Sequence, residues 1–313
     1  MGYYTKYNVA SNNPFVIIGG SAGLIGFCTH AFWAADDCVY FGDNPNINKS
    51  FLYNNLIFHR FEIKKNVRGS SVPRLDRESL KKLSICTPSL IEQKQIATFF
   101  TTLDSQISAA TSRLTSLKQV KEASLQAMFP QEGETVPKIR FKGFEGEWKK
   151  VKLNEICFNK ASNLSESSLG ENAGQYAVYG ANGYLQNIST FDISSEYVGI
   201  IKDGSGVGRA KIYPAYSSLL GTMQYILAKE NNEIRFISAL FENIDFSTFI
   251  AGSGIPHIYF RDYGEISVMV PLLAEQQKIA SYFTALDRKI ALQSKRLEKL
   301  KQIKAACLDK MFV

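Results

Sequence analysis

A glycine-rich run at residues 203–208, Asp-Gly-Ser-Gly-Val-Gly, is the first place where this sequence could do chemistry. It follows an apolar stretch that is typical of a β-strand, and a glycine-rich loop after a strand can cradle a phosphate group. The run lacks the Gly-Lys-Ser/Thr ending of a phosphate-binding loop and the spacing of a dinucleotide-binding fingerprint. A tight glycine turn is therefore the simpler interpretation. A third interpretation is a turn beside a DNA backbone, because Lys202, Arg209 and Lys211 are close to it in sequence.

The residue types of a catalytic or metal centre are scattered along this sequence. The histidines His30, His59 and His257 lie far apart, and none has the spacing of a metal ligand. The pair Asp36-Asp37 is more typical of a solvated turn than of a metal site. The sequence shows neither the Asn/Asp-Pro-Pro-aromatic signature of a DNA methyltransferase nor the carboxylate-plus-lysine cluster of a nuclease. We therefore expect no catalytic residues, no metal and no cofactor on this chain.

The sequence predicts strands over residues 219–228 and 264–270. Two short loops combine glycine and proline just before the last predicted strand of each unit. Residues 252–257 read Gly-Ser-Gly-Ile-Pro-His, and residues 69–74 read Gly-Ser-Ser-Val-Pro-Arg. Glycine and proline in this arrangement are typical of a structural turn. The loops could also face a ligand, and His257 and Arg74 would then occupy equivalent positions with different chemistry. The sequence leaves both interpretations open.

The composition argues against several protein classes. No apolar stretch is long enough to span a bilayer, and the sequence does not open with a secretory signal. The 5 cysteines form no Cys-x-x-Cys pair, which argues against a zinc site or a disulfide framework and for a reducing cytoplasm. The net charge of +7 permits binding to a polyanion such as nucleic acid, although many basic proteins bind none.

An internal repeat organises the chain. Residues 88–97, Pro-Ser-Leu-Ile-Glu-Gln-Lys-Gln-Ile-Ala, recur 183 positions later as Pro-Leu-Leu-Ala-Glu-Gln-Gln-Lys-Ile-Ala at 271–280. Across residues 88–129, 21 of the 42 positions are identical to their counterparts without a gap. The same offset aligns residues 69–73 with 252–256. Such a repeat predicts two structurally related units.

The centres of the two units differ. Residues of about 30–65 and 213–248 do not align at the same offset. A shared frame with divergent centres is expected if the frames meet the same packing demands while the two centres recognise different ligands.

The repeated tail has the spacing of a long helix. Apolar residues recur alternately every four and three positions through residues 96–117 and again, with a single polar exception, through 279–300. This heptad seam is suited to packing against another long helix. About 39 residues at a rise of 1.5 Å predict a rod of roughly 60 Å. Two such copies favour an antiparallel pair with a globular unit at each end; the alternative is two independent helices, each on its own domain.

The combination of these motifs resembles the specificity subunits of type I restriction-modification systems. The resemblance rests on the doubled Glu-Gln-containing run and on the long helix that ends in Met-Phe. It also rests on Pro-Lys-Ile-Arg-Phe-Lys-Gly-Phe-Glu-Gly-Glu-Trp at 137–148, Tyr-Gly-Ala-Asn-Gly at 179–183 and Lys-Asp-Gly-Ser at 202–205. It covers nearly the whole chain.

The resemblance implies a mixed α/β fold with two target-recognition domains joined by two long antiparallel coiled-coil helices. The predicted boundaries are 1–88 for the first recognition domain, 89–129 for the first spacer helix, 130–150 for a linker, 151–272 for the second recognition domain and 273–313 for the second spacer helix. By the repeat offset Gly2-Tyr3 falls opposite Tyr184-Leu185, so we expect the first domain to be truncated at its N-terminus and the second to be the competent reader.

The resemblance also implies the function. Each recognition domain would read half of a bipartite DNA target through base edges in the major groove. The helices would dock modification subunits, which methylate DNA, and a motor-nuclease subunit would join for cleavage. S-adenosylmethionine, ATP and Mg²⁺ are expected on those partners. The candidate DNA-binding residues are Tyr179, Asn182, Lys202, Ser205, Arg209, Lys211, His257, Ser70 and Arg74.

Three alternatives remain at this stage. The chain could be a coiled-coil interaction protein without enzymatic activity, in which the helices mediate association and the globular parts bind protein. It could be an inactive recombination cassette or a half-subunit of such a system. It could also be a nuclease or methyltransferase whose site the motifs do not reveal. A basic run on the second helix, including Lys295, Arg296 and Lys299, is either a solvated helix face or a contact to DNA or a partner.

Overall fold

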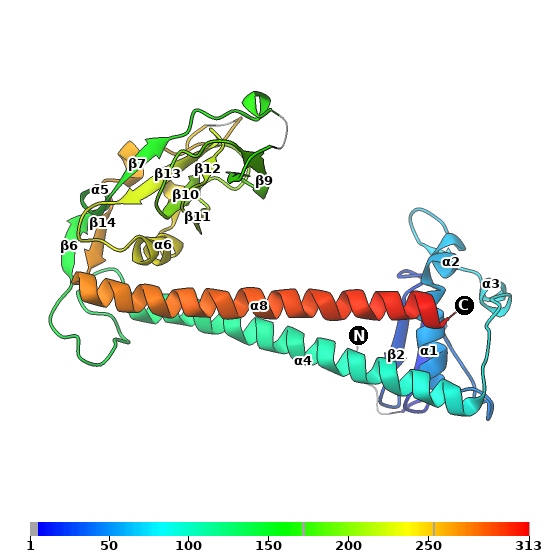
Figure 1. The fold of residues 1–313 in the computed structure, drawn as a ribbon. Helices are drawn as coiled ribbons and strands as arrows, with labels where there is room; N and C mark the ends of the chain where they lie inside the picture. Colours follow the sequence, from blue (N-terminus) through cyan, green and yellow to red (C-terminus); the bar gives the residue numbers. More distant parts are fainter. Residues whose placement is uncertain (1–5, 171–172, 253, 313) are drawn as a thin grey trace. The chain divides into compact units, whose positions relative to one another are not determined.

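Two compact units make up the chain. The structure, a computed structural model, describes residues 6–170, 173–252 and 254–312, so that Gly2, Tyr3 and Ser253 lie outside the described residues. The first unit comprises residues 1–114 with 292–313, and the second comprises residues 115–291. Two long helices contribute to both units (Figure 1).

The two long helices confirm the repeat. Helix α4 spans Leu90–Met128 and helix α8 spans Leu273–Met311, each with 39 residues. Both ends of α8 therefore keep the 183-residue offset from the ends of α4. The domain boundaries drawn from the sequence remain a prediction.

The predicted heptad seam is buried in each unit. In the first unit the buried seam residues are Ile96, Phe100, Leu103 and Ala110 of α4 with Gln293 and Leu297 of α8, and Leu308 beyond the predicted stretch is buried as well. The seam residues Ile107, Leu114 and Leu300 are half-buried. In the second unit they are Ile279, Phe283 and Leu286 of α8, which are buried together with Leu125 and Met128 of α4 beyond the predicted stretch. Because both seams are apolar and meet each other, the helices pack as an antiparallel coiled coil and not as independent helices.

Polar contacts across the seam repeat with the sequence. In the first unit Lys304 pairs with Asp104 at 2.5 Å, and in the second its counterpart Lys121 pairs with Asp287 at 2.6 Å. Gln293 donates a hydrogen bond to the carbonyl of Ala110, its own counterpart in the repeat, at 3.1 Å. Equivalent positions meet in this way when two copies of one helix pair antiparallel.

A buried glutamine ties each globular part to its long helix. Gln93 donates to the carbonyl of Pro88 at 2.9 Å and accepts from the backbone N–H of Asn48 at 2.9 Å. Its counterpart Gln276 donates to the carbonyl of Pro271 at 3.0 Å and accepts from the N–H of Glu233 at 3.0 Å. Asn48 and Glu233 are the N-caps of the helices α1 and α6, so each glutamine fixes a domain helix to the start of a long helix.

The second unit is built on strands that pair antiparallel, with one parallel pair between residues 218–219 and 178–179. One sheet has the order β11-β10-β13-β7, from strands Ala210–Tyr213, Tyr197–Ile201, Met223–Ala228 and Cys157–Ala161. A second has the order β12-β8-β9, from Ser218–Leu219, Tyr176–Gly180 and Gly183–Ile188. Strands β6 (Lys149–Lys152) and β14 (Ser267–Val270) form a pair. Helix α6 (Ile234–Glu242) lies between the larger sheet and α8 (Figure 1).

Short helices complete the second unit. They are α5 (Leu153–Ile156), α7 (Phe260–Tyr263), and the 3₁₀ turns Glu166–Ser168 and Phe246–Phe249. The main core gathers Leu153, Ile200 and Phe236, all fully buried, together with the helix residues Met128 and Phe283. The sheet, α6 and the helical pair therefore share one core.

The first unit is smaller. Strands β1 (Asn13–Ile17), β2 (Ile25–Cys28) and β3 (Cys38–Tyr40) form a sheet of order β2-β1-β3, and β4 (Val67–Arg68) pairs with β5 (Arg74–Leu75). Helices α1 (Lys49–Phe58), α2 (Arg60–Lys65) and α3 (Arg77–Lys81) follow the sheet. Phe51 of α1 is buried against Phe100 of α4 and Phe312, which follows α8. In the second unit Phe236 is buried in the same way against Phe283 of α8 and Phe129, which follows α4. The fold is thus mixed α/β, as predicted.

Two local predictions need correction. The strand expected over 219–228 is interrupted, because the N–H of Gly221 turns away to the carbonyl of Leu164 at 2.7 Å. The strand expected over 264–270 begins only at Ser267, because α7 ends at Tyr263 with Gly264 as its C-cap. The linker is irregular through residues 131–137 as expected, but Trp148 at its end is buried in the core.

Buried tyrosines form a polar network inside the second unit. Tyr225 donates to the carboxylate of Asp192 at 2.5 Å and accepts from the N–H of Leu219 at 2.7 Å. Tyr197 shares a hydrogen bond of 2.7 Å with Ser217. Burial raises the pKa of Tyr197, and burial and Asp192 raise the pKa of Tyr225, so both phenols stay neutral at physiological pH.

Replacing Tyr225 by phenylalanine should destabilise the protein. The change leaves the Leu219 N–H and a carboxylate oxygen of Asp192 without this partner, which costs about 1–3 kcal/mol of unfolding free energy. Urea unfolding measures the loss. The matched control is Tyr184→Phe, because Tyr184 is 56% exposed. Equal stability of the two variants would contradict the assigned network.

A charge in the helical seam should be strongly destabilising. Leu297 is 9% exposed in the seam, and Leu292, five residues earlier on α8, is 61% exposed. The variant Leu297→Glu buries a carboxylate without a partner and should lose about 3 kcal/mol, whereas Leu292→Glu should lose little. Thermal melts followed by helical circular dichroism compare the two. Similar melting of both variants would rule out the seam.

Candidate nucleic-acid interface

The glycine-rich run is the turn of a β-hairpin. It connects β10 to β11, which pair antiparallel from Tyr197 opposite Tyr213 to Ile200 opposite Ala210. Gly204, Gly206 and Gly208 have φ angles of +86°, +82° and +87°, a region that favours glycine. The tight-turn interpretation is confirmed.

The second candidate loop packs directly on this turn. The N–H of Gly204 donates to the carbonyl of Pro256 at 2.8 Å, and the N–H of Ile258 donates to the carbonyl of Lys202 at 2.9 Å. Asp203 and His257 form an isolated antiparallel bridge. Two segments about 50 residues apart in sequence therefore meet at one end of β10, and they bring four predicted residues together: Lys202, Ser205, Arg209 and His257.

The side chains of this group are accessible to a ligand. Ser205 and Arg209 are exposed, while Lys202 and His257 are half-buried. Lys202 pairs with Asp203 at 3.3 Å, and the Arg209 Nε donates to the carbonyl of Gly206 at 3.3 Å. These partners orient two cations without neutralising the whole turn.

Two residues that the sequence patterns did not reveal extend the same surface. The ring of Tyr259, 46% exposed, lies 5.0 Å from the ring of His257. The guanidinium of Arg261 lies over the Tyr259 ring, 4.8 Å from its centre. The alternation His257, Tyr259, Arg261 was the only sequence signal. We call Lys202, Ser205, Arg209, His257, Tyr259 and Arg261 the loop cluster.

The remaining predicted residues of the second unit have different surroundings. Lys211 is exposed on the edge strand β11. The ring of Tyr179 is half-buried and packs on Tyr213 at 4.9 Å, so much of its surface serves the fold. Asn182 is exposed in the turn between β8 and β9, and no hydrogen bond among the described residues joins it to the loop cluster.

The first unit contains the matching loop. Gly20 donates its N–H to the carbonyl of Pro73 at 3.0 Å, and Leu75 donates to the carbonyl of Ile18 at 2.8 Å. Pro73 and Leu75 lie at the 183-residue offset from Pro256 and Ile258 and form corresponding bonds. Their partners Gly20 and Ile18 each lie one residue before the counterparts of Gly204 and Lys202. Ser70 and Arg74 are both exposed on this loop, and Arg74 lies 3.8 Å from Asp37. Arg74 and His257 thus occupy equivalent places.

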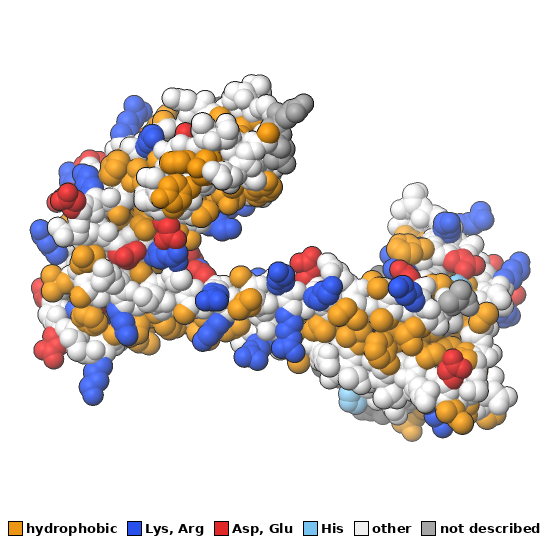
Figure 2. Space-filling view, in the orientation of Figure 1, with side chains coloured by type: hydrophobic (Ala, Val, Ile, Leu, Met, Phe, Trp, Pro, Cys, Tyr) orange, Lys and Arg blue, Asp and Glu red, His pale blue; other side chains and the backbone are white. Residues whose placement is uncertain are grey.

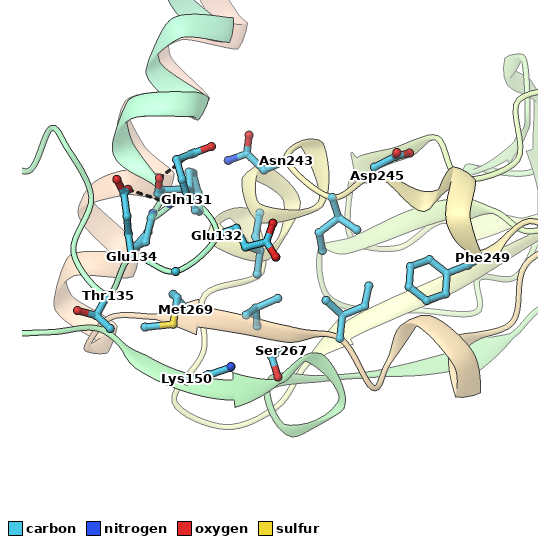
Figure 3. A pocket seen from close by; sticks show the side chains of 17 residues that line it. Gln131, Glu132, Glu134, Thr135, Lys150, Asn243, Asp245, Phe249, Ser267 and Met269 are labelled. Atoms are coloured by element: carbon cyan, nitrogen blue, oxygen red, sulfur yellow. Dashed lines mark hydrogen bonds between the residues drawn. The ribbon is translucent and has the colours of Figure 1, made fainter.

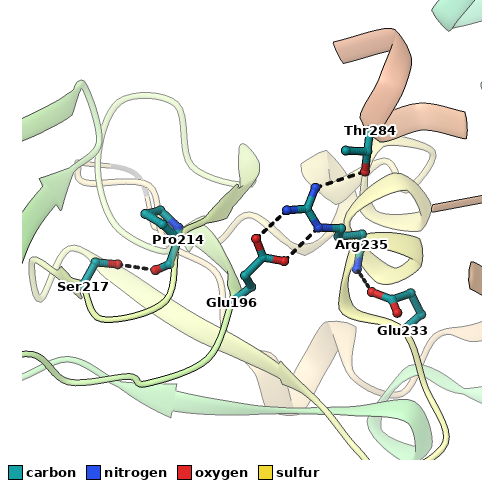
Figure 4. Close-up of polar contacts among 6 residues, drawn as sticks. All are labelled: Glu196, Pro214, Ser217, Glu233, Arg235 and Thr284. Atoms are coloured by element: carbon teal, nitrogen blue, oxygen red, sulfur yellow. Dashed lines mark hydrogen bonds and ion pairs between the residues drawn. The ribbon is translucent and has the colours of Figure 1, made fainter. Parts of the chain in front are cut away.

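An ion pair holds the strand that carries the loop cluster. Arg235 of α6 forms a bidentate pair with Glu196, the residue before β10, and its Nη1 donates to Thr284 of α8 at 3.1 Å (Figure 4). Glu233, the N-cap of α6, accepts from the N–H of Arg235. Strand β10 is therefore fixed to both α6 and the long helix before it enters the turn.

A cavity of about 660 Å³ in the second unit is a poorer candidate for a polyanion. It lies between the linker, α6 and β14, and Glu132, Glu134 and Asp245 line it with Lys150 as their cationic neighbour (Figure 3). Three carboxylates against one ammonium disfavour phosphate at this place.

Side chains that could bind a metal stay apart in the described part of the chain. Within it, no three His, Cys, Asp or Glu side chains come together as metal ligands. His59 pairs with Glu62 on α2 and His30 contacts Thr29, so the histidines lie in separate surroundings. No helix among the described residues combines the length and apolarity needed to cross a membrane.

Comparisons with known proteins identify relatives across the chain. The family described as type I restriction modification DNA specificity domain matches residues 1–119 and 145–302. The type I restriction enzyme MjaVIII specificity subunit of Methanocaldococcus jannaschii is 21% identical over 296 residues, covering 85% of this chain and 70% of that protein.

Solved structures share the fold. The type I restriction-modification system S subunit from M. genitalium superposes with a TM-score of 0.76 at 19% identity, covering 100% of this chain and 86% of that one. A structure described by complex assembly and conformational transition of the type I restriction-modification system gives a TM-score of 0.53 at 15% identity, covering 96% and 82%.

Proposed function

Since the chain belongs to the family of type I restriction-modification DNA specificity proteins, we propose that it reads a bipartite DNA target for a methyltransferase complex. One observation carries the proposal. Both units hold a glycine- and proline-containing loop by corresponding backbone bonds, and the residue at its end is the exposed Arg74 in one and the half-buried His257 in the other. A constant frame that presents different polar side chains is what a reader of two different half-sites requires.

The loop cluster of the second unit is proposed as one reading surface. Lys202, Arg209 and Arg261 supply cations for phosphates, and His257 and Ser205 can exchange hydrogen bonds with base edges. Tyr259 adds an exposed aromatic face between them. Lys211 and Asn182 are proposed to contact the DNA backbone beside this surface. Ser70 and Arg74, on the matching loop of the first unit, are proposed to contact the other half-site.

The long helices are proposed to dock the modification subunits. Lys295, Arg296, Lys299 and Lys301 are exposed on α8, and Figure 2 shows cationic side chains gathered along the helices. Lys304 of the same basic run is instead bound to Asp104. S-adenosylmethionine, ATP and Mg²⁺ would be held by the modification and motor-nuclease subunits.

Removing two lysines should weaken DNA binding without regard to sequence. Because each lysine would neutralise one phosphate, Lys202→Ala and Lys211→Ala should each lower the slope of log K against log salt concentration by roughly 1. Gel shifts across a salt series, with the modification subunits present, measure this slope. The matched control replaces Lys138 and Lys142, which are both exposed lysines of the linker. An unchanged slope in the first pair would refute their contact with DNA.

Methyl transfer should require a second subunit. Methylation of a base needs a cofactor pocket and a polar clamp for the flipped base, and the proposed surface offers neither. Incorporation of labelled methyl groups into DNA should therefore occur only after the modification subunit is added. Transfer by the chain alone that a single substitution in it abolishes would assign catalysis to this protein.

A further inference from the structure

The imidazole of His257 carries its proton on a defined nitrogen. Its Nδ1 lies 3.3 Å from the carbonyl oxygen of Ile255. A carbonyl oxygen only accepts hydrogen bonds, so Nδ1 is the donor of this contact. A neutral imidazole has one N–H, and its other nitrogen is then an acceptor. The contact with Ile255 therefore makes Nε2 the acceptor of the ring.

The turn that holds the Ile255 carbonyl is common to both units. Gly252 has a φ angle of +94°, and Gly69, its counterpart 183 positions earlier, has +93°. A Cβ at Gly252 would lie 2.6 Å from the Ile255 oxygen and 2.9 Å from the Nδ1 of His257. A Cβ at Gly69 would lie 2.8 Å from the oxygen of Val72, the counterpart of Ile255. Glycine thus allows the backbone to approach, and the Nδ1 side of the ring is turned toward its own loop.

The other nitrogen of the ring is available to a ligand. No described residue bonds to the Nε2 of His257, and this atom is not buried. The ring of Tyr259 lies 5.0 Å from the imidazole, and the guanidinium of Arg261 stacks on the Tyr259 ring. A stacked neighbour on one side and the Ile255 bond on the other restrict rotation of the imidazole. The loop therefore presents an accessible acceptor in a fixed orientation.

The other side chains of the loop cluster have different hydrogen-bonding chemistry. Its lysine and arginines only donate, and its two hydroxyls both donate and accept. The neighbouring carboxylate of Asp203 only accepts, but Lys202 already pairs with it at 3.3 Å. Among these described side chains, the Nε2 of His257 is therefore the unoccupied atom that accepts without donating. Such an atom can distinguish a donor from an acceptor on a base edge.

We propose that His257 selects an amino base, adenine or cytosine, at one position of the half-site, on the strand that it faces. This inference rests on the proposed function, because the loop cluster must then face the major groove. There adenine N6 and cytosine N4 donate, whereas guanine O6 and N7 and thymine O4 accept. An acceptor opposite guanine or thymine leaves two polar groups unpaired, which is unfavourable. The counterpart Arg74 only donates, which favours guanine, so the two half-sites differ in base class at equivalent positions.

The test is selection from a library of random DNA duplexes by the intact chain with its modification subunits, followed by sequencing. One position should show adenine or cytosine about fivefold or more over guanine or thymine, the lower end of what a base contact discriminates. His257→Arg removes the acceptor and supplies donors, so the preference should reverse to guanine at that position alone. His257→Gln, whose Oε1 accepts in place of Nε2, should keep the amino base. The preference is a ratio within one variant, so the charge added by arginine cancels.

Asp203→Ala is the matched control, because it removes the neighbouring acceptor and should leave the preference unchanged. Guanine or thymine, selected by the unaltered protein at the position that His257→Arg changes, would overturn the proposal. A preference that Asp203→Ala removes would overturn it too, as would identical selected sequences for the unaltered protein and His257→Arg. All three outcomes leave sequence-specific binding intact. Absence of any selected sequence would instead refute the proposed function, and this inference with it.

Discussion

The buried glutamine at the start of each long helix is the contact on which both units depend. Gln93 and Gln276 each bond to a proline carbonyl behind them and to the N-cap of a domain helix 45 or 43 residues earlier. Both are 2% exposed, so the bonds are shielded from water and removal of a partner would leave a buried polar group unpaired. Each glutamine therefore fixes where its domain helix meets the coiled coil. The strands that pack on α1 or α6 are positioned through these helices.

The sequence predicted the frame well because the frame is periodic and duplicated. A heptad seam is a local pattern, and its second copy at 183 residues gave both helices their length and their partner. The repeat also marked the two glutamines as identical positions, but not their role. A side chain that bonds to a backbone group more than 40 residues away leaves no trace in local spacing. The predicted strand through Gly221 was wrong for the same reason, because the N–H of Gly221 bonds to the distant carbonyl of Leu164.

The candidate site was predictable only in part. Glycine spacing marked the turn at 203–208, and proline marked the loop before Ile258, but that the two meet depends on tertiary bonds. Tyr259 and Arg261 were missed because an exposed aromatic and an exposed arginine resemble any surface pair until their stacking is known. Tyr179 was chosen from a motif, and its ring packs largely on Tyr213. Residue type indicates what a side chain can do, whereas its neighbours determine what remains free to act.

Under the proposed function, the division between frame and loop would let such a protein change its target without a change of fold. The two buried glutamines, the seam and the ion pairs of Asp104 and Asp287 all lie in the repeated part of the chain. His257 and Arg74 lie outside these contacts, at the ends of loops that backbone bonds hold in place. Backbone bonds do not depend on the side chain, so either residue can be replaced without disturbing the loop's path. Under the proposed function, a substitution there would change the chemistry offered to a base edge while the domain keeps its place on the helix.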